Sequence, residues 1–565
     1  MRTTDQQLKI MDHVAQMGPG DSLAVHARAG TGKTTTLALI AAANPKTTFR
    51  YYGFNRALIT EAKNRFGRNV RPTTLHALAF HSLGLKGENI HQRYTPAEIV
   101  QILSLHGYGK EMDAALIARH IDTTLTNFCH SGTTAIHPDH TDLPGSTSAG
   151  LRDLILIQTR RMWADIMNGL LPPTHDHYLK MFHIHLCMGL IGQPREDAIL
   201  YDEAQDSNPV STAIIRLAHH ARHIWVGDPW QAIYGFRGAK NALDGFSGTV
   251  MELTVTHRFG QPIVDWANYV LTWHPTPPTT PITTTRIDGC VRFDDEPDPK
   301  STLITRTRAG LFMAALRQSQ ANRTMTIEGN INGHAALLRD LAALKLGRPQ
   351  SIRTESLKRH RSWQELVTSA EYSASPDLKR ASEVFSIIPP EHINDALRKI
   401  SEGNKPAGEA DLTLTTIHAM KGREADRISI GSDALSPSEA TESHYDERPE
   451  EISEETNLLY VAMTRARNAL TLPTQFERPF RSPRTTVEMP PDVYRIAKAA
   501  IDHSIENQDQ KNIREALEQQ GFSLLNRGPD LVLVDNSNRG IRLAELCLKP
   551  EILASKFPKY ANSIP

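Results

Sequence analysis

Short apolar runs alternate with helical spacings in the first part of the chain. Leu23–Arg28 is a run that predicts a buried strand, and Lys33–Ala43 has the spacing of a helix that follows it. Thr48–Phe54 predicts a second strand and Arg56–Phe66 a second helix. Buried strands that alternate with helices are typical of an α/β domain with a parallel sheet.

The pattern changes between about Leu83 and Leu186, where apolar residues keep helical spacing and convincing strands are rare. Alternation of strand, loop and helix returns between Ala198 and about Asn268. This order predicts one α/β domain that is interrupted by a helical insertion.

A second α/β domain is expected after Pro275–Pro281, a Pro-rich segment that predicts a stiff connector. Basic, helical residues from about Ala335 to Ile400 interrupt this domain, and the acidic, Ser-rich stretch Gly431–Glu455 predicts a solvated loop. The expected strands are Ser301–Thr305, Thr324–Glu328, Leu412–Thr416 and Ala469–Leu472, and the expected last helix is Leu458–Thr464. The tail is expected to hold a linker, a helix and two strands, over Pro473–Pro491, Asp492–Gln520, Phe522–Leu525 and Leu531–Asp535.

The composition is that of an ordinary globular protein of 565 residues, long enough for roughly three or four domains. Lys plus Arg and Asp plus Glu both number 63, so the bulk charge does not indicate a nucleic-acid partner, although it is compatible with local basic grooves. The four cysteines lie far apart, which argues against a disulfide framework or a thiolate zinc site. The polar N-terminus lacks a signal-peptide core and no apolar stretch is long enough to span a bilayer, so a cytoplasmic protein without membrane contact is expected.

Ala27–Thr35 carries the residues of a phosphate-binding loop between the first predicted strand and its helix. Gly30 and Gly32 let the backbone turn tightly, so that its N–H groups point at phosphate oxygens. Lys33 adds a positive charge for the β- and γ-phosphates, and the Thr34 hydroxyl can ligate Mg²⁺.

The apolar run in Ile199–Asp206 ends in Asp202 and Glu203, as expected where a buried parallel strand reaches the catalytic edge of its sheet. Asp202 can hold the metal, directly or through water, and Glu203 can polarise the attacking water. Together with the phosphate-binding loop, this motif predicts a Mg²⁺-dependent enzyme that hydrolyses a nucleoside triphosphate.

Val226–Gly238 follows the next predicted strand. Gln231 can hydrogen-bond the γ-phosphate or the catalytic water. Tyr234 and Phe236 offer faces on which bases can stack, and Arg237 can bind a phosphate. Isolated aromatic residues more often belong to a core, but this loop is polar and flanked by glycines, which favours a functional role.

Further motifs, in order along residues 4–472, resemble those of the UvrD/Rep branch of superfamily 1 helicases. The matching segments are Thr4–Ile10, Phe54–Asn55, Thr74–His76, Leu253–Phe259, Thr415–Glu424 and Glu455–Ala466. Within this branch the helicase core of the F-box DNA helicase family is the most similar, on Phe54 before Asn55, His257–Gly260, Thr174–Lys180 and an insertion around Ser351–Ser369. The residues before Gln7 leave no room for an F-box, so ubiquitin-ligase assembly is not expected.

The resemblance implies an ATP site that two RecA-like domains complete. Gln7 would read the adenine edge, and Glu424 would bind the ribose. His257 stands where an adenine-stacking Tyr is common in the branch, and its ring can stack in the same way. The ATP-binding residues are then Gln7, Ala29, Gly30, Thr31, Gly32, Lys33, Thr34, Thr35, His257 and Glu424.

The resemblance also assigns catalytic and DNA-binding residues. Arg258 would reach the γ-phosphate and Arg465 would act as the arginine finger, so that hydrolysis is coupled to domain closure. The expected catalytic residues are Lys33, Glu203, Gln231, Arg258 and Arg465, and the expected metal ligands are Thr34 and Asp202. The expected DNA contacts are Phe54, Asn55, Thr74, His76, Tyr234, Phe236, Arg237, Thr416 and His418.

The expected fold class is α/β, with two RecA-like P-loop NTPase domains that have parallel sheets and a helical insertion each, and a small C-terminal α/β appendage. The first domain (1A) is assigned to residues 1–82 and 187–272, with its insertion (1B) at 83–186. The second domain (2A) is assigned to residues 282–334 and 405–475, with its insertion (2B) at 335–404, and the accessory region to 476–565.

These motifs predict an ATP-dependent 3′→5′ DNA helicase or translocase of DNA repair, recombination or replication. Its cofactors would be ATP and Mg²⁺, and its partners single-stranded DNA, single/double-strand junctions and a protein bound by the C-terminal region. One alternative is a DNA-stimulated ATPase switch that displaces DNA-bound proteins with little unwinding. Another is a helicase–nuclease fusion, suggested by Pro529-Asp530 and Glu545, although Cys547 stands where such nucleases have Lys.

Four histidines lie close together in the first insertion: His175, His177, His183 and His185. A metal site is one interpretation, but no nearby Cys or well-spaced carboxylate completes a pattern, so a polar and partly DNA-facing segment is favoured. The basic residues Arg353, Lys358, Arg359 and Arg361, with Trp363, suit a DNA grip or a solvated helix face equally well.

Overall fold

The computed structural model divides the chain into two compact units, residues 1–264 with 280–288 and residues 265–279 with 289–565. The residues that it describes are 3–105, 113–143, 145, 147–235, 238–329, 331–358, 360–368, 376–436, 449–476, 522–527, 530–535 and 540–542. Each unit is built around a parallel sheet of its own.

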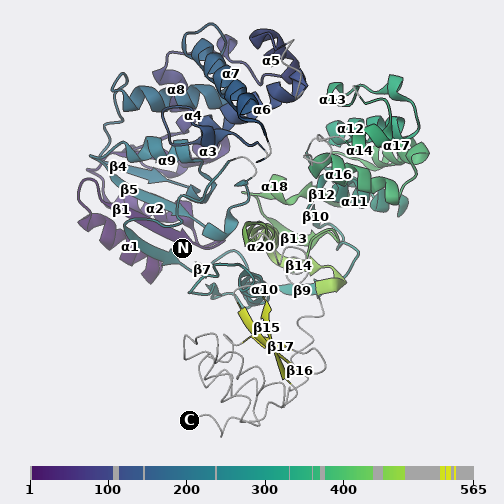
Figure 1. Ribbon diagram of the computed structural model, residues 1–565. Coiled ribbons are helices and arrows are strands. Elements are labelled where there is room, and N and C mark those ends of the chain that lie inside the picture. Colours follow the sequence, from purple (N-terminus) through teal and green to yellow (C-terminus); the bar gives the residue numbers. More distant parts are fainter. Residues whose placement is uncertain are drawn as a thin grey trace. The chain divides into compact units, whose positions relative to one another are not determined.

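In the described part of the first unit, six strands form a parallel sheet in the order β3-β2-β4-β5-β1-β6 (Figure 1). The strands are β1 (Ser22–Ala27), β2 (Phe49–Tyr52), β3 (Val70–Thr73), β4 (Ala198–Tyr201), β5 (Arg222–Gly227) and β6 (Thr249–Leu253). Because the strands are parallel, the loops that follow their carboxyl ends meet at one edge of the sheet.

Alternating residues of the strands face two helical layers. In β1, Leu23 and Val25 belong to the core under one layer, and Ala24 belongs to the core under the other. The first layer is formed by α1 (Asp5–Gln16), α2 (Lys33–Ala43) and α3 (Arg56–Arg65), and the second by α4 (Leu75–Ser82), α8 (His175–Cys187) and α9 (Pro209–Arg216). Figure 1 shows α1 and α2 on the opposite side of the sheet from α8 and α9.

The expected helical insertion of the first unit is present. Its helices α5 (Pro96–Leu103), α6 (Ala114–His130) and α7 (Ala149–Met167) enclose a separate apolar core, which Ile184 of α8 joins. Helix α8 therefore belongs to two cores at once, because one side of it packs on the sheet layer and another on the insertion.

A short return segment, residues 280–288, also belongs to the first unit. Its strand β8 (Thr283–Thr284) pairs in parallel with β7 (Val255–Thr256). The Thr284 hydroxyl donates to the carbonyls of Thr256, at 3.1 Å, and Phe259, at 3.2 Å. Helix α10 (Gln261–Leu271) lies between β7 and β8 in sequence, and the division between the units falls within it.

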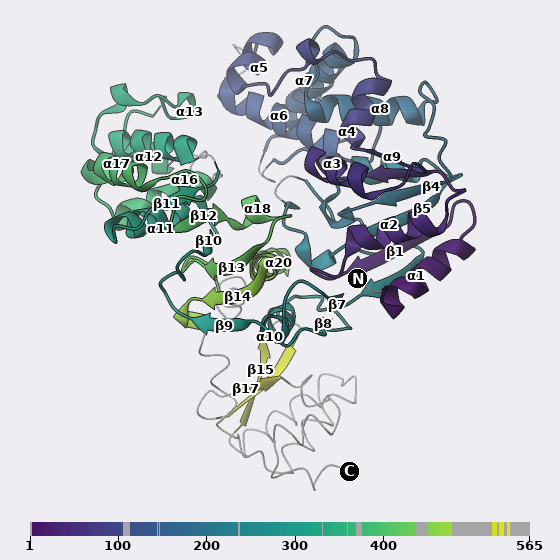
Figure 2. The same ribbon diagram turned by 180° about the vertical axis from the view of Figure 1, so that it is seen from behind.

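The described residues of the second unit form another six-stranded parallel sheet, in the order β11-β12-β10-β13-β14-β9. The strands are β9 (Cys290–Phe293), β10 (Thr302–Thr305), β11 (Met325–Ile327), β12 (Leu412–Thr416), β13 (Ala425–Ile430) and β14 (Ala466–Leu472). Figure 2 shows most of the helices of this unit gathered beside β10, β11 and β12.

The helices that lie between β11 and β12 in sequence form the insertion of the second unit. The core between them and the sheet includes Leu303 of β10 and Leu414 of β12. The helices of the unit are α11 (Arg308–Gln320), α12 (Ile331–Lys345), α13 (Glu355–Lys358), α14 (Trp363–Thr368), α16 (Pro376–Glu383), α17 (Ile393–Gly403), α18 (Ile417–Met420) and α20 (Pro449–Met463).

The C-terminal region contributes a small antiparallel sheet in the described residues. Its strands are β15 (Phe522–Arg527), β16 (Asp530–Asp535) and β17 (Gly540–Arg542). The first two overlap the strands expected there, whereas the helix expected over Asp492–Gln520 lies outside the described residues. In the part of the chain that is described, no helix is both long and apolar enough to cross a bilayer.

The predicted fold class is confirmed, since two parallel α/β sheets with helical insertions are present. The loop expected over Gly431–Glu455 is wrong in its last part, because α20 already begins at Pro449. Pro at the start of a helix and acidic residues in its first turn favour a helix, and the acidic composition hid that signal. Among the described residues, the strands that were missed include β3, β8, β9, β13 and β17.

Candidate active site

The phosphate-binding loop lies between β1 and α2 and is shaped by two glycines in the left-handed region, Gly30 (φ 74°) and Gly32 (φ 83°). A Cβ atom on Gly30 would lie 2.5 Å from Thr256 Oγ1 and 2.6 Å from Arg258 Cβ. No side chain fits in that space, so the loop packs directly against the segment that carries Arg258. The backbone N–H of His257 donates to the Gly30 carbonyl at 3.0 Å, which fixes the same contact.

Lys33 is the first residue of α2, and its ammonium lies 3.1 Å from Glu203 Oε2. Burial lowers the pKa of Lys33, but the charges of Glu203, Asp228 and Asp202 outweigh that effect, so its pKa is raised. Lys33 is therefore held as a cation at the loop, as phosphate binding requires.

Asp202 follows the carboxyl end of β4 and is 1% exposed. Its Oδ2 atom accepts hydrogen bonds from the Thr34 hydroxyl and from the Tyr51 hydroxyl, both at 2.9 Å. Burial and the neighbouring charge of Glu203 raise the pKa of Asp202. A carboxylate and a hydroxyl so close together are hard oxygen donors that suit Mg²⁺, so Thr34 and Asp202 fit the role of metal ligands.

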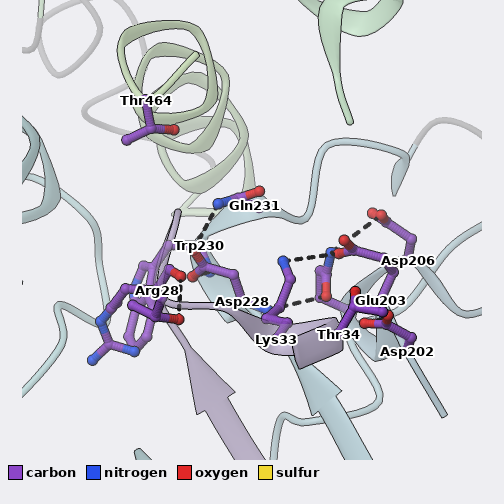
Figure 3. A network of polar contacts seen from close by, with 12 residues as sticks. Arg28, Lys33, Thr34, Asp202, Glu203, Asp206, Asp228, Trp230, Gln231 and Thr464 are labelled. Carbon is purple, nitrogen blue, oxygen red and sulfur yellow. Dashed lines mark hydrogen bonds and ion pairs between the residues drawn. The ribbon is translucent and has the colours of Figure 1, made fainter. Parts of the chain in front are cut away.

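Glu203 connects to Gln231 through a chain of polar contacts (Figure 3). Gln205 Nε2 donates to Glu203 Oε2 at 2.6 Å, and Gln205 Oε1 accepts from the N–H of Asp228 at 3.1 Å. The Asp228 Oδ2 atom in turn accepts from Gln231 Nε2 at 2.8 Å. Glu203 itself has a left-handed backbone (φ 55°), which is strained for a residue with a Cβ and is typical of functional sites.

The remaining nucleotide candidates of the first unit lie around the same loop. Gln7 is buried in α1, where its side chain accepts from the N–H of Thr4 and donates to Thr36 Oγ1, both at 3.0 Å. The carbonyl of Arg258 accepts from Arg286 Nη1 of the return segment at 2.5 Å. The structure therefore gathers the residues expected at the nucleotide from the loops after β1, β4, β5 and β7 and from α1.

A cavity of about 590 Å³ runs through the first unit from Asp202 and Glu203 to Phe54, Thr74, His76 and Tyr234. The rings of Phe54 and Tyr234 are stacked, with centroids 5.8 Å apart and planes 6° apart. Phe54 is 47% exposed, which is a large fraction for an apolar aromatic side chain. A flat, accessible aromatic face in a cavity suits a nucleobase.

Two of the expected DNA contacts also cap helices. Asn55 accepts from the N–H of Leu58 at 2.9 Å at the start of α3, and Thr74 accepts from the N–H of Ala77 at 3.0 Å at the start of α4. These bonds explain both residue types on local grounds. His76 packs edge-on against Tyr178, and burial lowers its pKa.

The four clustered histidines belong to α8, and two of them, His175 and His177, line the cavity. His175 lies 3.0 Å from the Tyr178 hydroxyl, and His177 Nδ1 accepts from the N–H of Thr174 at 3.1 Å. Burial lowers the pKa of His177 to about 4, so this ring is neutral at pH 7. Among the described residues, no group of three or more His, Cys, Asp or Glu side chains is arranged to hold a metal.

The candidates of the second unit lie at two opposite edges of its sheet. Glu424 and Arg465 directly precede the parallel strands β13 and β14, whose first residues, Ala425 and Ala466, are paired, so both lie at the amino edge. Thr416 and His418 follow β12 and lie at the carboxyl edge. The Arg465 guanidinium donates to the Val461 carbonyl at 3.0 Å, and Glu424 is paired with Arg467 at 2.8 Å.

Some predicted residues cannot be placed, and some important ones were not predicted. Phe236, Arg237, Arg359, Pro529, Glu545 and Cys547 lie outside the described residues. Residues that sequence reasoning missed are Tyr51, Gln205 and Asp228. Asp228 stands directly after a predicted strand, which was the available signal, whereas Tyr51 meets Asp202 only through the pairing of β2 with β4.

The sheets and the site define a P-loop nucleotide-binding fold with two RecA-like domains. Residues 212–475 match the family model of the UvrD-like helicase C-terminal domain. The chain is similar to F-box DNA helicase protein 1 of Schizosaccharomyces pombe, with 29% identity over 523 residues that cover 83% of this chain and 57% of the relative. It is also similar to F-box DNA helicase 1 of Gallus gallus, with 28% identity over 512 residues that cover 84% of this chain and 49% of the relative.

These relatives confirm the resemblance to UvrD-like helicases and to the F-box DNA helicase family. The chain spans about half the length of the curated relatives that it matches. A solved structure described as the PRRSV helicase covers 98% of this chain and 70% of its own, with 12% identity and a TM-score of 0.30. A TM-score this low carries no weight, so the fold class rests on the sheets of the chain itself.

Proposed function

We propose that this chain is an ATP-dependent DNA helicase or translocase that moves 3′→5′ on single-stranded DNA. The observation that carries the proposal is the cavity of the first unit, which joins Asp202 and Glu203 to the stacked rings of Phe54 and Tyr234. One continuous space thus contacts residues suited to phosphate chemistry and residues suited to bases. The similarity to proteins named DNA helicases supports DNA as the substrate.

The residues of the phosphate-binding loop would bind and orient the triphosphate. Thr34 and Asp202 would hold Mg²⁺, which when bound neutralises charge on the phosphate oxygens. Lys33 now pairs with Glu203 at 3.1 Å. A γ-phosphate that attracts Lys33 would release the Glu203 carboxylate, which could then accept a proton from the attacking water. Nucleotide binding itself would thereby prepare the general base.

The polar chain from Glu203 to Gln231 would connect hydrolysis with DNA. Gln231 lies three positions before Tyr234 in the same loop, and Tyr234 stacks on Phe54 at the cavity. A shift of Gln231 on loss of the γ-phosphate would therefore displace the stacked rings of Phe54 and Tyr234. This link is the structural basis that we propose for coupling ATP turnover to movement.

For the second unit we propose the roles that follow from the resemblance. Glu424 would bind the ribose, Arg465 would stabilise charge on the γ-phosphate, and Thr416 with His418 would contact DNA. The proposed domain limits are those given above, with 1A at residues 1–82 and 187–272, 2A at 282–334 and 405–475, and the two insertions between their halves. DNA repair, recombination or replication is the proposed setting.

A strand-displacement assay tests the proposal. Purified chain, ATP and Mg²⁺ are mixed with labelled duplexes that carry a 3′ or a 5′ single-stranded tail, and Glu203→Gln serves as the inactive control. We expect release of the labelled strand from the 3′-tailed duplex only. Release from the 5′-tailed duplex alone would overturn the polarity. DNA-stimulated hydrolysis without displacement or translocation would favour the ATPase switch, and shortened strands on a denaturing gel would favour the nuclease fusion.

A further inference from the structure

Arg28 is the second residue of the phosphate-binding loop, and its side chain is fully buried. Its guanidinium carbon lies 4.0 Å from the ring centroid of Trp230. Figure 3 shows the two side chains side by side. One terminal nitrogen, Nη2, lies 3.0 Å from Glu252 Oε1 and 3.3 Å from the carbonyl oxygen of Thr280. None of the roles assigned above to nucleotide or metal binding uses this side chain.

A cation in this place is costly for the fold. Within the described residues, the Nε and Nη1 atoms of Arg28 are buried and have no hydrogen-bond partner. Buried donors that lose water without gaining an acceptor destabilise a protein, and an apolar side chain of similar volume would avoid that cost. Packing alone therefore does not explain a buried arginine at this position, whereas its contacts with neighbouring segments suit a role in positioning them.

Three segments meet at Arg28: two of them carry catalytic candidates, and the third holds the segment of Arg258. The first is the phosphate-binding loop, in which the Arg28 carbonyl accepts from the Thr31 hydroxyl at 2.8 Å. The second is the loop after β5, where the backbone N–H of Trp230 donates to Asp228 Oδ1 at 3.3 Å. Asp228 also holds Gln231. The backbone of Trp230 and the side chain of Gln231 therefore share the Asp228 carboxylate, which links Trp230 to the residue proposed to sense the γ-phosphate.

The third segment is the return segment, residues 280–288, which begins at the Thr280 carbonyl that Arg28 contacts. Arg286 in this segment donates to the carbonyl of Arg258. This segment contacts the phosphate-binding loop through the guanidinium of Arg28, a planar group with several donors. Lysine would supply one charge but not the flat face for Trp230.

We propose that Arg28 is a positioning residue that sets Gln231, through Trp230, and the segment holding Arg258, through Thr280, relative to the phosphate-binding loop. Arg28 acts through these residues and does not touch the nucleotide. The inference rests on the proposed ATP hydrolysis at this site and adds a determinant of its rate. A misplacement of catalytic groups by about 1 Å can cost about a hundredfold in rate, so the expected effect is on kcat.

A double-mutant cycle tests this inference in the full chain, with steady-state ATP hydrolysis at saturating DNA. Arg28→Met keeps the volume of the side chain and is expected to lower kcat about tenfold or more with little change in KM for ATP. Arg28→Lys is expected to fall between Met and the wild type. Gln231→Ala is expected to lower kcat by itself, and adding Arg28→Met to it should cost less than Arg28→Met costs alone, because one of the two proposed paths from Arg28 runs through Gln231.

An unchanged kcat in Arg28→Met, or a loss of the same factor in the presence and absence of Gln231, would overturn the positioning role. If Arg28→Met does not fold, Trp230→Leu replaces it in the same cycle, since it removes the other half of the contact. Lys33→Ala separates this inference from the proposed function. Absent hydrolysis in the wild type, or full hydrolysis in Lys33→Ala, refutes the function itself. Inactive Lys33→Ala together with fully active Arg28→Met refutes only the role of Arg28.

Discussion

The two parallel sheets differ most at the start of one helix. In the first unit, α2 follows β1 through a loop with two left-handed glycines, and its N-cap residue, Gly32, provides no side-chain cap. In the second unit, α11 follows β10 through Arg306 and Thr307 only. Backbone N–H groups at the start of a helix attract anions, so each unit offers the beginnings of a phosphate site.

In the second unit, the Asp433 carboxylate occupies the start of α11, where a phosphate would otherwise bind. Asp433 accepts from the N–H of Arg306 at 3.1 Å, and from the N–H and hydroxyl of Thr307 at 2.9 and 3.0 Å. A Cβ atom on Gly310 would lie 1.8 Å from Asp433 Oδ2, so the carboxylate sits tightly against the first turn of α11. The nearby cavity of about 330 Å³ also has Asp294, Asp295, Glu296 and Glu383 in its lining.

We infer from this difference that the loop, and not the sheet, decides where a nucleotide would bind. Both units have six parallel strands in the described residues, with helices on the sheet. The first leaves N–H groups and Lys33 for phosphate, whereas the second has satisfied the same groups internally with a negative charge. We therefore expect one nucleotide site per chain, in the first unit.

The largest expected effect is that of removing the charged groups of the first site. Lys33→Ala should lower kcat for ATP hydrolysis by about a thousandfold or more, because the phosphates lose their cation. Glu203→Gln should do the same but leave ATP binding largely intact, since the amide keeps the shape of the side chain. Steady-state hydrolysis and equilibrium binding of ATP measure the two effects. Wild-type turnover in Glu203→Gln would contradict the role of that carboxylate.

Gly30→Ala tests the close packing of the loop on Thr256 and Arg258. The left-handed backbone and the contact of 2.5 Å together should cost about 2–4 kcal/mol of unfolding free energy. Gly84→Ala is the matched control, because Gly84 is also left-handed (φ 63°) but has nothing within 4 Å of its Cβ position. Urea denaturation of both variants isolates the packing. Equal losses would show that the loop does not need the close approach.

Asp433→Asn should destabilise the second unit by about 1–3 kcal/mol, because the amide offers N–H groups where the first turn of α11 needs acceptors. ATP binding by the folded protein should be unchanged. Thermal unfolding and nucleotide titration measure the two quantities. A loss of ATP affinity in this variant would mean that the second unit contributes to the nucleotide site at this position.

Phe54→Ala tests the other end of the cavity and has the smallest expected effect. Loss of one stacking face should raise the Kd for single-stranded oligonucleotide by about 5- to 30-fold, which corresponds to about 1–2 kcal/mol. Fluorescence anisotropy with labelled oligothymidine measures it. Leu190→Ala changes another exposed apolar side chain, 67% exposed and absent from the cavity lining, and serves as the control. Equal Kd values for Phe54→Ala and the wild type would remove the stack from the DNA path.

Local sequence pattern was enough to predict some elements of both units. The helix Lys33–Ala43 and the strand Leu412–Thr416 have the bounds expected of them, because strand, loop and helix follow one another there without long-range help. The strand β13 was missed because its first half is not apolar: Asp426 and Arg427 are charged and exposed. Short strands with polar ends are formed by pairing with neighbours and carry little signal of their own.

The polar network around the site could not be predicted from the sequence for the same reason. Tyr51 and Asp202 are 151 positions apart and meet only because β2 lies beside β4 in the sheet. The buried contact of Arg28 with Glu252 similarly joins residues 224 positions apart. Motif spacing identifies residues that face a ligand, whereas residues that hold them in place depend on the order of the strands.

The stoichiometry of nucleotide binding decides whether the nucleotide binds to the first unit alone. Isothermal titration of the purified chain with a non-hydrolysable ATP analogue and Mg²⁺ should give one site per chain. That site should be lost or strongly weakened in Lys33→Ala and retained in Asp433→Asn. Two sites per chain, or one site that survives Lys33→Ala and disappears in Asp433→Asn, would contradict the assignment of the nucleotide to the first unit.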